Sequence, residues 1–329
     1  MKALVTGGTG FLGAHVVRAL LERNIRVRVL ARPCSDRRNL QGLPVEIVEG
    51  DVTDLPSVRR AVQGCQLVFH AAALYSFWTR PRQRIYEVNV DGTRHVLQAA
   101  WEARVEGVVH TSSVAALGLC PDGTPADENT LLDYRHIVGD YKRSKYLGQQ
   151  VALAYAHKGL PLVIVNPSFP VGPYDLKPTP TGQVIVDFLN RRMPAYMDTG
   201  INVVSASDVG LGHVLALEKG TPGELYVLGG ENLTFRELLG LLAEVAGLPA
   251  PKVRLPYAPL LALSYFNAGL CRLTGTTPRM TPDTLRMSRH PMVFSPAKAV
   301  EELGFPQTPA REALAAAVQW FREQGYVRC

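Results

Sequence analysis

A tyrosine and a lysine that lie four residues apart are the pair in this sequence best suited to proton transfer. They are Tyr141 and Lys145, and on a helix this spacing places both side chains on one face. A free tyrosine has a pKa of about 10, and a neighbouring ammonium group favours the phenolate and lowers that pKa. We therefore expect Tyr141 to act as a general acid or base, with Lys145 lowering the pKa of its phenol.

Helices contain many tyrosine–lysine pairs by chance, so the pair alone is a weak indication of a catalytic site. A run of hydroxyl residues upstream strengthens that indication. Thr111, Ser112 and Ser113 end a short apolar run, and Ser113 precedes Tyr141 by 28 residues. The carboxyl ends of strands in a parallel sheet are where such sheets bind ligands. We expect Ser113 to orient a substrate carbonyl oxygen, Tyr141 to supply its proton, and a nicotinamide cofactor to supply hydride. Lys145 would then also bind a ribose hydroxyl of the cofactor, and Thr111 would lie beside it.

A glycine-rich turn at the start of the chain predicts where that cofactor binds. Residues 6–13 read Thr-Gly-Gly-Thr-Gly-Phe-Leu-Gly and stand between an apolar run and a helical pattern. Glycines at this spacing permit a tight turn and a close approach of the backbone to a pyrophosphate. The N–H groups at the start of the helix can then bind the anion. The predicted cofactor-binding residues are Gly7, Gly10, Phe11, Leu12 and Gly13, and the alternative is an ordinary strand–helix loop.

The end of the second predicted strand indicates which dinucleotide is preferred. An acidic residue there would bind the adenosine ribose and favour NAD. From Val29 onward, however, the sequence has Arg32 and no acid before Asp36. We expect Arg32 to meet the 2′-phosphate of NADP, with Arg37 or Arg38 in reach. The alternative is NAD, with Arg32 a solvated surface residue.

Two further segments are predicted to contact the cofactor. After the third strand, Asp51 and Val52 are placed beside the adenine, although Asp51 is almost as well explained as a helix N-cap or turn residue. At the end of the fourth strand, the small side chains of Ala71, Ala72 and Ala73 would let a ribose or nicotinamide lie against the backbone.

The order of the elements predicts the fold that positions these residues. Short apolar runs alternate with helical patterns through the first half of the chain, which is typical of βαβ units and a parallel sheet. The predicted strands are Ala3–Thr6, Val27–Ala31, Val45–Val48, Leu67–His70, Gly107–Thr111 and Leu162–Val165. The predicted helices are Phe11–Arg23, Leu55–Val62, Arg84–Arg104, Tyr141–His157, Asp208–Leu217, Phe235–Ala246 and Pro309–Gln324. We predict an α/β protein with a Rossmann-type doubly wound parallel sheet over residues 1–165, to which residues 201–218 return. A smaller, mostly helical substrate-binding domain would cover residues 166–329.

Composition narrows the classes of partner. With 47% hydrophobic and 19% charged residues, the chain has the balance of a folded protein. The net charge is +6, but the basic residues form no block, so we predict a small-molecule substrate and no nucleic-acid partner. Five cysteines without a CxxC pair, and histidines without metal-ligand spacing, predict neither a disulfide framework nor a metal site.

Two segments bear on the compartment. The first residues enter a strand directly, which predicts a cytoplasmic protein without a cleaved signal peptide. The apolar stretch from Tyr257 to Leu273 is interrupted by Pro259, Asn267 and Arg272. We therefore expect it to be a buried helix rather than an integral membrane segment, with peripheral membrane contact as the alternative.

Five motifs, in this order, resemble those of the extended short-chain dehydrogenase/reductase family: TGGTGFLG, HAAA, NVDGT, TSS and YKRSK. The likeness covers nearly the whole chain. Within the family the sequence resembles dihydroflavonol 4-reductase-like proteins and, more closely, bacterial hopanoid-associated sugar epimerases. The stretches shared with these groups are residues 37–40, 118–128, 177–182 and 228–232.

The resemblance implies roles for individual residues. Ser113, Tyr141 and Lys145 would be catalytic, and Asn89 would hold a water or a backbone group in the proton relay. Pro167 and Ser168, within the segment 166–168, would lie near the nicotinamide. Members of the family often form homodimers through two helices, which here would begin near residues 84 and 141.

Three functional hypotheses remain open. The first is net reduction of a ketone or aldehyde by NADPH, which the predicted NADP preference favours. The aromatic residues Tyr75, Phe77 and Trp78 also suggest an apolar pocket, although ordinary packing would explain them as well. The second is a nucleotide-sugar epimerase or dehydratase, in which hydride leaves and returns within one cycle. In its favour, Asn166 matches a residue that contacts the nucleotide diphosphate in such epimerases. The third is a cofactor-binding sensor, but such proteins usually lack the tyrosine or the lysine that this chain has.

Overall fold

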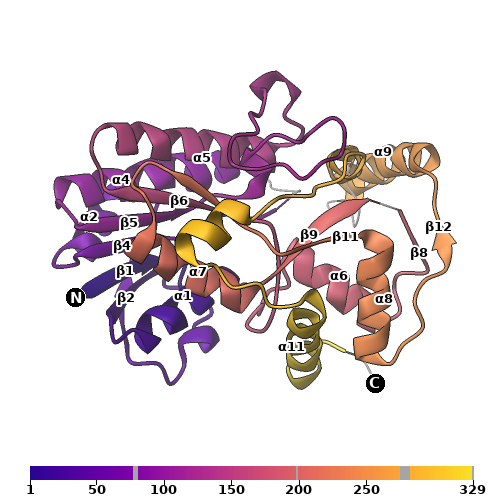
Figure 1. Ribbon diagram of the computed structural model, residues 1–329, viewed down its shortest axis with the longest axis horizontal. Coiled ribbons are helices and arrows are strands. Elements are labelled where there is room, and N and C mark those ends of the chain that lie inside the picture. Colours follow the sequence, from indigo (N-terminus) through magenta and orange to yellow (C-terminus); the bar gives the residue numbers. More distant parts are fainter. Residues whose placement is uncertain (77–80, 198, 275–281, 328–329) are drawn as a thin grey trace.

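The main sheet of the computed structural model, which describes residues 1–76, 81–197, 199–274 and 282–327, is entirely parallel (Figure 1). Within this part of the chain it has seven strands in the order β10-β6-β5-β4-β1-β2-β3. The strands are β1 (Lys2–Thr6), β2 (Arg26–Ala31), β3 (Val45–Glu49), β4 (Leu67–His70), β5 (Gly107–Thr111), β6 (Leu162–Pro167) and β10 (Leu225–Leu228). The strand order reverses between β1 and β4, the point at which doubly wound sheets bind ligands.

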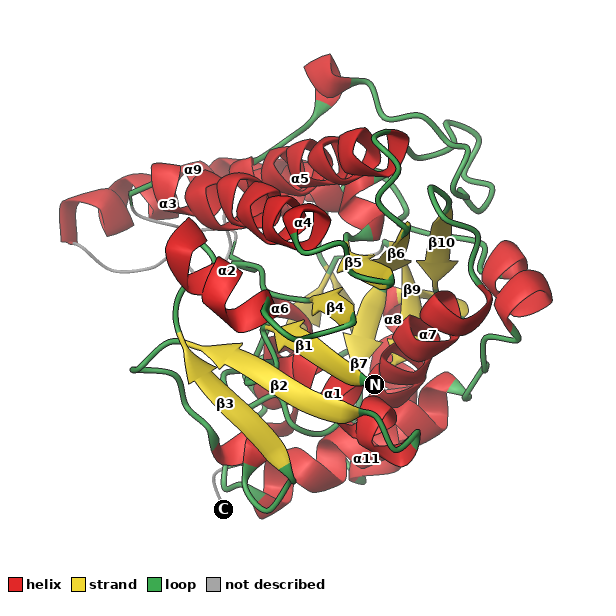
Figure 2. Cartoon of the chain, turned by 90° about the vertical axis from the view of Figure 1, so that its left-hand side faces the viewer, coloured by secondary structure: helices red, strands yellow, loops and turns green. Residues whose placement is uncertain are grey.

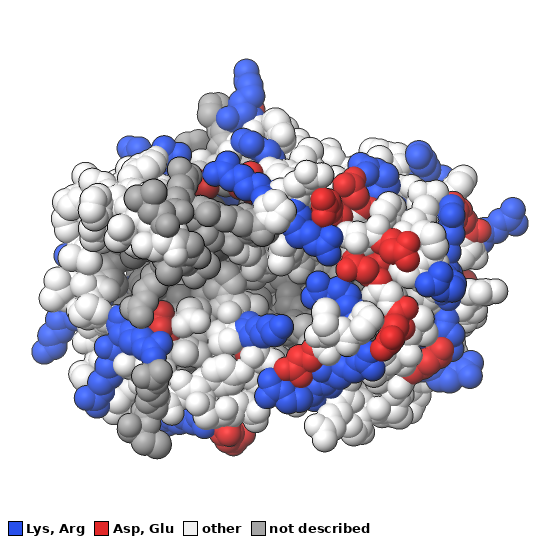
Figure 3. Space-filling view, turned by 180° about the vertical axis from the view of Figure 1, so that it is seen from behind, with Lys and Arg blue, Asp and Glu red and all other residues white. Residues whose placement is uncertain are grey.

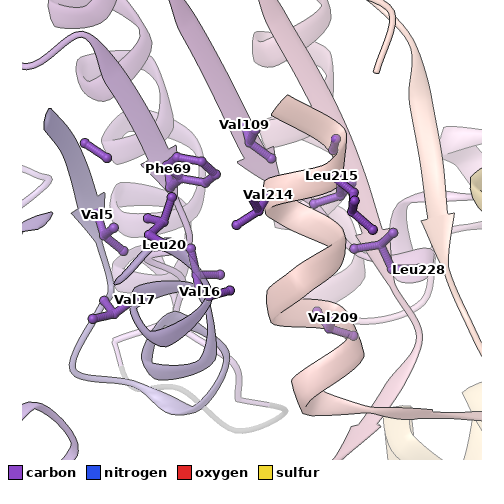
Figure 4. Close-up of a cluster of buried hydrophobic side chains, with 14 of the residues drawn as sticks. Val5, Val16, Val17, Leu20, Phe69, Val109, Val209, Val214, Leu215 and Leu228 are labelled. Carbon is purple, nitrogen blue, oxygen red and sulfur yellow. The ribbon is translucent and has the colours of Figure 1, made fainter. Parts of the chain in front are cut away.

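Helices cover both faces of this sheet (Figure 2). One face carries α1 (Phe11–Glu22) and α7 (Ala206–Lys219), which lie side by side over a shared apolar core (Figure 4). The other carries α2 (Leu55–Val62), α4 (Gly92–Glu102) and α5 (Asp140–His157). Because the central strands are buried on both faces, they appear in the sequence as continuous apolar runs. The six strands predicted from such runs are confirmed, with ends that shift by at most two residues.

Two elements from the second half of the chain lie against this sheet. α7 packs on α1, and β10 pairs in parallel with β6. The strand before α7, β9 (Gly200–Ser205), instead lies in a separate three-stranded sheet, between β7 (Phe169–Val171) and β11 (Glu231–Thr234). The predicted division into two domains stays a prediction, but the chain clearly crosses between the two cores several times.

The second core is built from helices around the small sheet. Its helices are α6 (Pro180–Leu189), α8 (Phe235–Ala246) and α11 (Ala310–Glu323). A further strand pair, β8 (Ala195–Tyr196) with β12 (Val253–Arg254), lies at its edge. α6 is absent from the helices predicted from the sequence, because it follows a proline-rich stretch. Yet Pro180 occupies the first turn of α6, where proline is tolerated, and the Thr179 side chain accepts a hydrogen bond from Gly182 N to cap the helix.

The long helix predicted over Arg84–Arg104 is interrupted. The structure has α3 (Gln83–Tyr86), then a π-helical turn over Glu87–Asp91, then α4. A π-helical turn takes an extra residue without breaking the helical path, so the apolar periodicity of the sequence does not reveal it. Such turns occur frequently at functional sites.

The prediction that residues 257–273 form a buried helix is wrong about its burial. They form α9 (Tyr257–Thr274), which is followed by α10 (Pro282–Ser288). The exposed fractions of Leu263, Phe266 and Leu270 are 61%, 72% and 50%. Among the described residues, no helix has both the length and the apolar character that a bilayer span requires.

Candidate active site

The turn between β1 and α1 is closed so tightly that only glycine fits at two positions. Gly7 has a φ of +75°, in the left-handed region that glycine adopts easily. A Cβ on Gly7 would lie 2.6 Å from Ala72 N, and one on Gly13 would lie 2.1 Å from Gly7 O. Gly10 precedes the first residue of α1, and the first turn of α1 contains no acidic residue. The turn is therefore a backbone cradle at the positive end of a helix, which suits a pyrophosphate.

The end of β4 forms the neighbouring wall of this cradle. Ala71 N donates to Thr6 O at 3.1 Å, and Ala72 N donates to Thr6 Oγ1 at 3.4 Å. Ala71 and Ala72 are partly exposed and Ala73 is exposed, so small side chains border an accessible surface. This arrangement leaves room for a ribose or a nicotinamide against the backbone.

Asp51 stabilises a turn, which was the alternative to its predicted contact with an adenine. Its Oδ1 accepts hydrogen bonds from Thr53 N and Thr53 Oγ1, both at 2.9 Å. Burial alone raises the pKa of Asp51, but these hydrogen bonds and the positive charges of Arg84 and Arg32 hold it below its usual value. Val52 is buried beneath this turn. Contact of Asp51 and Val52 with an adenine stays a prediction.

The three arginines considered for the 2′-phosphate differ in their contacts. Arg37 donates to Glu49 at 2.6 Å, and Arg38 donates to both carboxylate oxygens of Asp36. Arg32 is exposed just after β2 and forms no salt bridge with any residue that the structure describes. Arg37 and Arg38 are thus already neutralised, and Arg32 is the guanidinium left to meet an added phosphate.

Ser113, Tyr141 and Lys145 converge at the carboxyl end of β5. Ser113 is the second residue after β5, while Tyr141 and Lys145 lie in successive turns at the start of α5. The Ser113 side chain is hydrogen-bonded to the Tyr141 phenol. Lys145 Nζ donates to Thr111 O at 2.9 Å, at the end of the same strand. Tyr141 and Lys145 are both buried, with exposed fractions of 9% and 6%.

Burial is the main cause of the shifted pKa values of Tyr141 and Lys145. It raises the pKa of Tyr141 to about 12, and the hydrogen bond from Ser113 only partly opposes this. It lowers the pKa of Lys145 to about 8. Lys145 is not among the groups that shift the pKa of Tyr141, because its ammonium group donates to the Thr111 carbonyl; the expected lowering of that pKa by Lys145 during catalysis stays a prediction. Tyr141 is therefore protonated at neutral pH.

Asn89 fixes the position of α5 relative to β4. It is buried in the π-helical turn, where its Oδ1 accepts from Leu74 N at 2.7 Å. Its Nδ2 donates to Leu74 O at 3.1 Å and to Ser144 Oγ at 2.9 Å. Ser144 Oγ in turn donates to Tyr141 O at 2.8 Å. Asn89 thus holds the backbone of Leu74, and its part in a proton relay stays a prediction.

Gln149 was missed by the analysis of the sequence, although it lies on the same face of α5 as Tyr141 and Lys145. Its Oε1 accepts from Ser112 Oγ at 2.7 Å and from Asn166 Nδ2 at 2.8 Å. Asn166 Nδ2 also donates to Ser113 O at 2.9 Å, and its side chain is fully buried. Together these contacts fix the Ser112 side chain and the Ser113 carbonyl group relative to α5 and β6. Contact of Asn166 with a substrate stays a prediction.

The end of β6 presents an unused polar group to the same region. Ser168 follows Pro167, the last residue of β6, and its N–H donates to Leu228 O at 3.2 Å. The Ser168 Oγ is buried and has no hydrogen-bond partner among the described residues. Buried polar groups are nearly always paired, so this hydroxyl is suited to a polar ligand. Together with the glycine cradle and the Lys145 ammonium, it fits a nicotinamide dinucleotide.

Comparison with known proteins identifies the family of the chain. The model of the NAD-dependent epimerase/dehydratase family matches residues 3–229. The chain belongs to this family.

Relatives with full-length similarity include both reductases and epimerases by name. A Synechocystis sp. protein named provisionally as a dihydroflavonol 4-reductase is 45% identical, covering 98% of the chain and 95% of that protein. Sterol demethylase protein B of Methylococcus capsulatus is 37% identical, covering 99% of the chain and 100% of that protein. The crystal structure of a nucleoside-diphosphate-sugar epimerase from Pseudomonas aeruginosa has a TM-score of 0.83 at 30% identity, covering 100% of the chain and 99% of that protein. The chain is therefore an NAD(P)-dependent enzyme of the extended short-chain dehydrogenase/reductase type.

Tyr75 packs against Tyr141. Its ring centroid lies 4.7 Å from that of Tyr141, with an angle of 33° between the rings. Burial and the negative charges of ionised Tyr141 and Asp175 raise the pKa of Tyr75 well above its usual value. This packing forms an apolar wall beside Tyr141. Phe77 and Trp78, predicted with Tyr75 as a pocket, lie outside the described residues.

Buried histidines support the strand ends of this epimerase-family sheet. His70 is hydrogen-bonded to Thr6 Oγ1 at 2.7 Å and to Thr93 Oγ1 at 3.0 Å, and burial lowers its pKa to about 3. His213 is hydrogen-bonded to Thr111 Oγ1 at 2.7 Å, and burial lowers its pKa to about 4. Both side chains are neutral packing groups rather than proton donors at neutral pH.

These histidines should make the fold acid-labile. In the unfolded chain a histidine has a pKa of about 6.5, so between that pH and about 4 the unfolded state binds more protons than the folded state. We expect the free energy of unfolding, measured by urea denaturation, to fall as pH falls through this window, by about 1.4 kcal/mol per pH unit for each such histidine. Burial raises the pKa of Asp175 to about 6, so this group is protonated earlier in the folded state than in the unfolded state. It therefore opposes the fall in the free energy of unfolding, but at most by the effect of one proton. In the His70→Gln variant the free energy of unfolding should fall less steeply with falling pH than in the wild type. A variant of His157, which is exposed, should keep the wild-type slope. Equal slopes for the wild type and His70→Gln would contradict the assignment of His70 as a buried, neutral histidine.

Proposed function

We propose that the protein reduces a ketone or an aldehyde to the alcohol with NADPH. The observation that carries this proposal is the hydrogen-bonded pair of Ser113 and protonated Tyr141 beside a backbone cradle for a dinucleotide. When bound, the nicotinamide supplies hydride to the carbonyl carbon. Tyr141 then donates its proton to the developing alkoxide, and Ser113 orients that oxygen. Lys145, held by the Thr111 carbonyl, supplies a positive charge and a donor for the ribose.

Net reduction is placed ahead of epimerisation because the Tyr75 ring packs as an apolar wall beside Tyr141, which suits an apolar carbonyl compound. Reduction begins with a proton donor, and burial keeps the Tyr141 phenol protonated. Epimerisation uses the same residue as a base in its oxidation step and as an acid in its reduction step, so a Ser113–Tyr141 pair serves both candidates. The name of the Synechocystis relative supports net reduction. The second candidate, a nucleotide-sugar epimerase, is supported by the name of the Pseudomonas aeruginosa neighbour.

One assay separates the two candidates. The purified protein is incubated with NADPH and, in turn, ketones, aldehydes and nucleotide sugars, while the nicotinamide absorbance and the products are followed. We expect loss of one NADPH for each alcohol formed from an apolar carbonyl compound. Interconversion of a nucleotide sugar without loss of NADPH would show the epimerase instead.

The preference for NADP is proposed from Arg32. Its guanidinium is exposed after β2 and is free of salt bridges within the described chain, so it can pair with a 2′-phosphate. We expect Arg32→Ala to raise the KM for NADPH by about 10–100-fold, as for the loss of a hydrogen bond to a charged group, and to leave the KM for NADH unchanged. Arg38→Ala, which removes a guanidinium paired with Asp36, is the matched control. Equal effects on both cofactors would contradict this role of Arg32.

A further inference from the structure

The helix α9 exposes four of its large side chains. Among its described side chains, the buried ones are small and recur at helical spacing: Ser264, Ala268 and Cys271. Four large side chains are exposed on the rest of the helix surface: Leu263, Tyr265, Phe266 and Leu270. We call these four residues the α9 face. The helices of a folded domain normally bury the large apolar residues and expose the polar ones. The α9 face is therefore a surface suited to an apolar medium outside the protein.

The same part of the sequence carries most of the net charge of the chain. Residues 250–290 contain six lysines and arginines and one acidic residue, so they carry +5 of the total charge of +6. Within α9 itself there is one charged residue, Arg272, and no acid. On the side of the molecule that carries α8 and α9, acidic side chains are sparse in the view of Figure 3. An apolar helix in a basic surrounding is attracted to an anionic surface.

The arginines next to the α9 face are placed at its rim. The Arg286 guanidinium, on α10, lies over the Tyr265 ring at 5.4 Å from its centroid. The Arg289 guanidinium lies over the Tyr257 ring at 5.8 Å. Both arginines are exposed. Tyrosine and arginine side chains beside exposed leucine and phenylalanine are the arrangement found where a helix lies in the headgroup region of a membrane.

We propose that the α9 face binds the surface of an anionic phospholipid bilayer, with Leu263, Phe266 and Leu270 in the acyl boundary and Arg286 and Arg289 at the phosphates. The helix would lie parallel to the surface, because its opposite, small-residue stripe is packed on the protein. This inference does not depend on the proposed reaction.

Sedimentation with lipid vesicles tests the proposal. The protein is mixed with vesicles of phosphatidylcholine alone, or of phosphatidylcholine with phosphatidylglycerol, at low and high salt. We expect binding to the vesicles that contain phosphatidylglycerol, and weaker binding to the neutral ones and at high salt. The double variant Leu263→Asp/Phe266→Asp should lower the partition coefficient by about tenfold or more, since each apolar side chain transferred from water contributes at least that factor.

Two controls keep the result interpretable. Leu131→Asp changes a leucine that is 92% exposed outside α9, and it should bind vesicles like the wild type. Circular dichroism and NADPH binding establish that each variant is folded. Absence of wild-type binding to anionic vesicles, or equal binding by the double variant, would overturn the proposal. So would a wild-type dimer that the double variant converts to a monomer without any change in vesicle binding, because a second copy would then cover the α9 face.

Discussion

Replacing Tyr141 by phenylalanine is expected to lower kcat for carbonyl reduction by about 10²–10⁴-fold, the usual contribution of a positioned proton donor. The phenol is buried, protonated and hydrogen-bonded to Ser113. The hydroxyl is the only group removed, so NADPH binding, followed by fluorescence titration, should not change. Tyr146→Phe, on the same helix, is the matched control and should retain activity. A Tyr141→Phe enzyme with nearly full kcat would remove Tyr141 from the mechanism.

Replacing Gly13 by alanine should weaken NADPH binding by about 10–100-fold, the range expected when a well-packed site has to move to admit a methyl group. The added Cβ would lie 2.1 Å from Gly7 O, which is backbone and cannot move without opening the turn. Fluorescence titration measures the Kd. Gly240→Ala, at a helical position with nothing within 4 Å of the added Cβ, is the control and should bind NADPH as the wild type does. An unchanged Kd for Gly13→Ala would show that this turn is not the phosphate cradle.

Much of the first half of the fold could be predicted from the sequence, because its strands are buried on both faces. Val108 and Val109 of β5, for example, are fully buried, and such strands appear as apolar runs bounded by turn residues. The second half was harder. β11 has the sequence Glu-Asn-Leu-Thr, which shows neither an apolar run nor a clean alternation, so its pairing with β9 depends on tertiary contacts.

The site residues that the sequence missed are those whose role depends on long-range contacts. Gln149 stands eight residues after Tyr141 on α5, which was a usable signal, but its partners Ser112 and Asn166 come from other elements. The Tyr141 pKa could not be inferred from the spacing to Lys145, because desolvation in the folded chain raises it and the opposing contribution comes from Ser113. The exposure of α9 could not be inferred either, since an apolar helix has the same composition whether it faces a core or a membrane. The cytoplasmic location and the homodimer stay predictions.

The most direct test of the central claim is a crystal structure of the protein with NADPH. We predict that the pyrophosphate lies on the turn of Gly7, Gly10 and Gly13 and that the ribose next to the nicotinamide contacts Lys145. The nicotinamide should lie beside Tyr141, with its amide group at the Ser168 hydroxyl. A dinucleotide bound in another place, or a nicotinamide separated from Tyr141 by protein side chains, would contradict the assignment of this site.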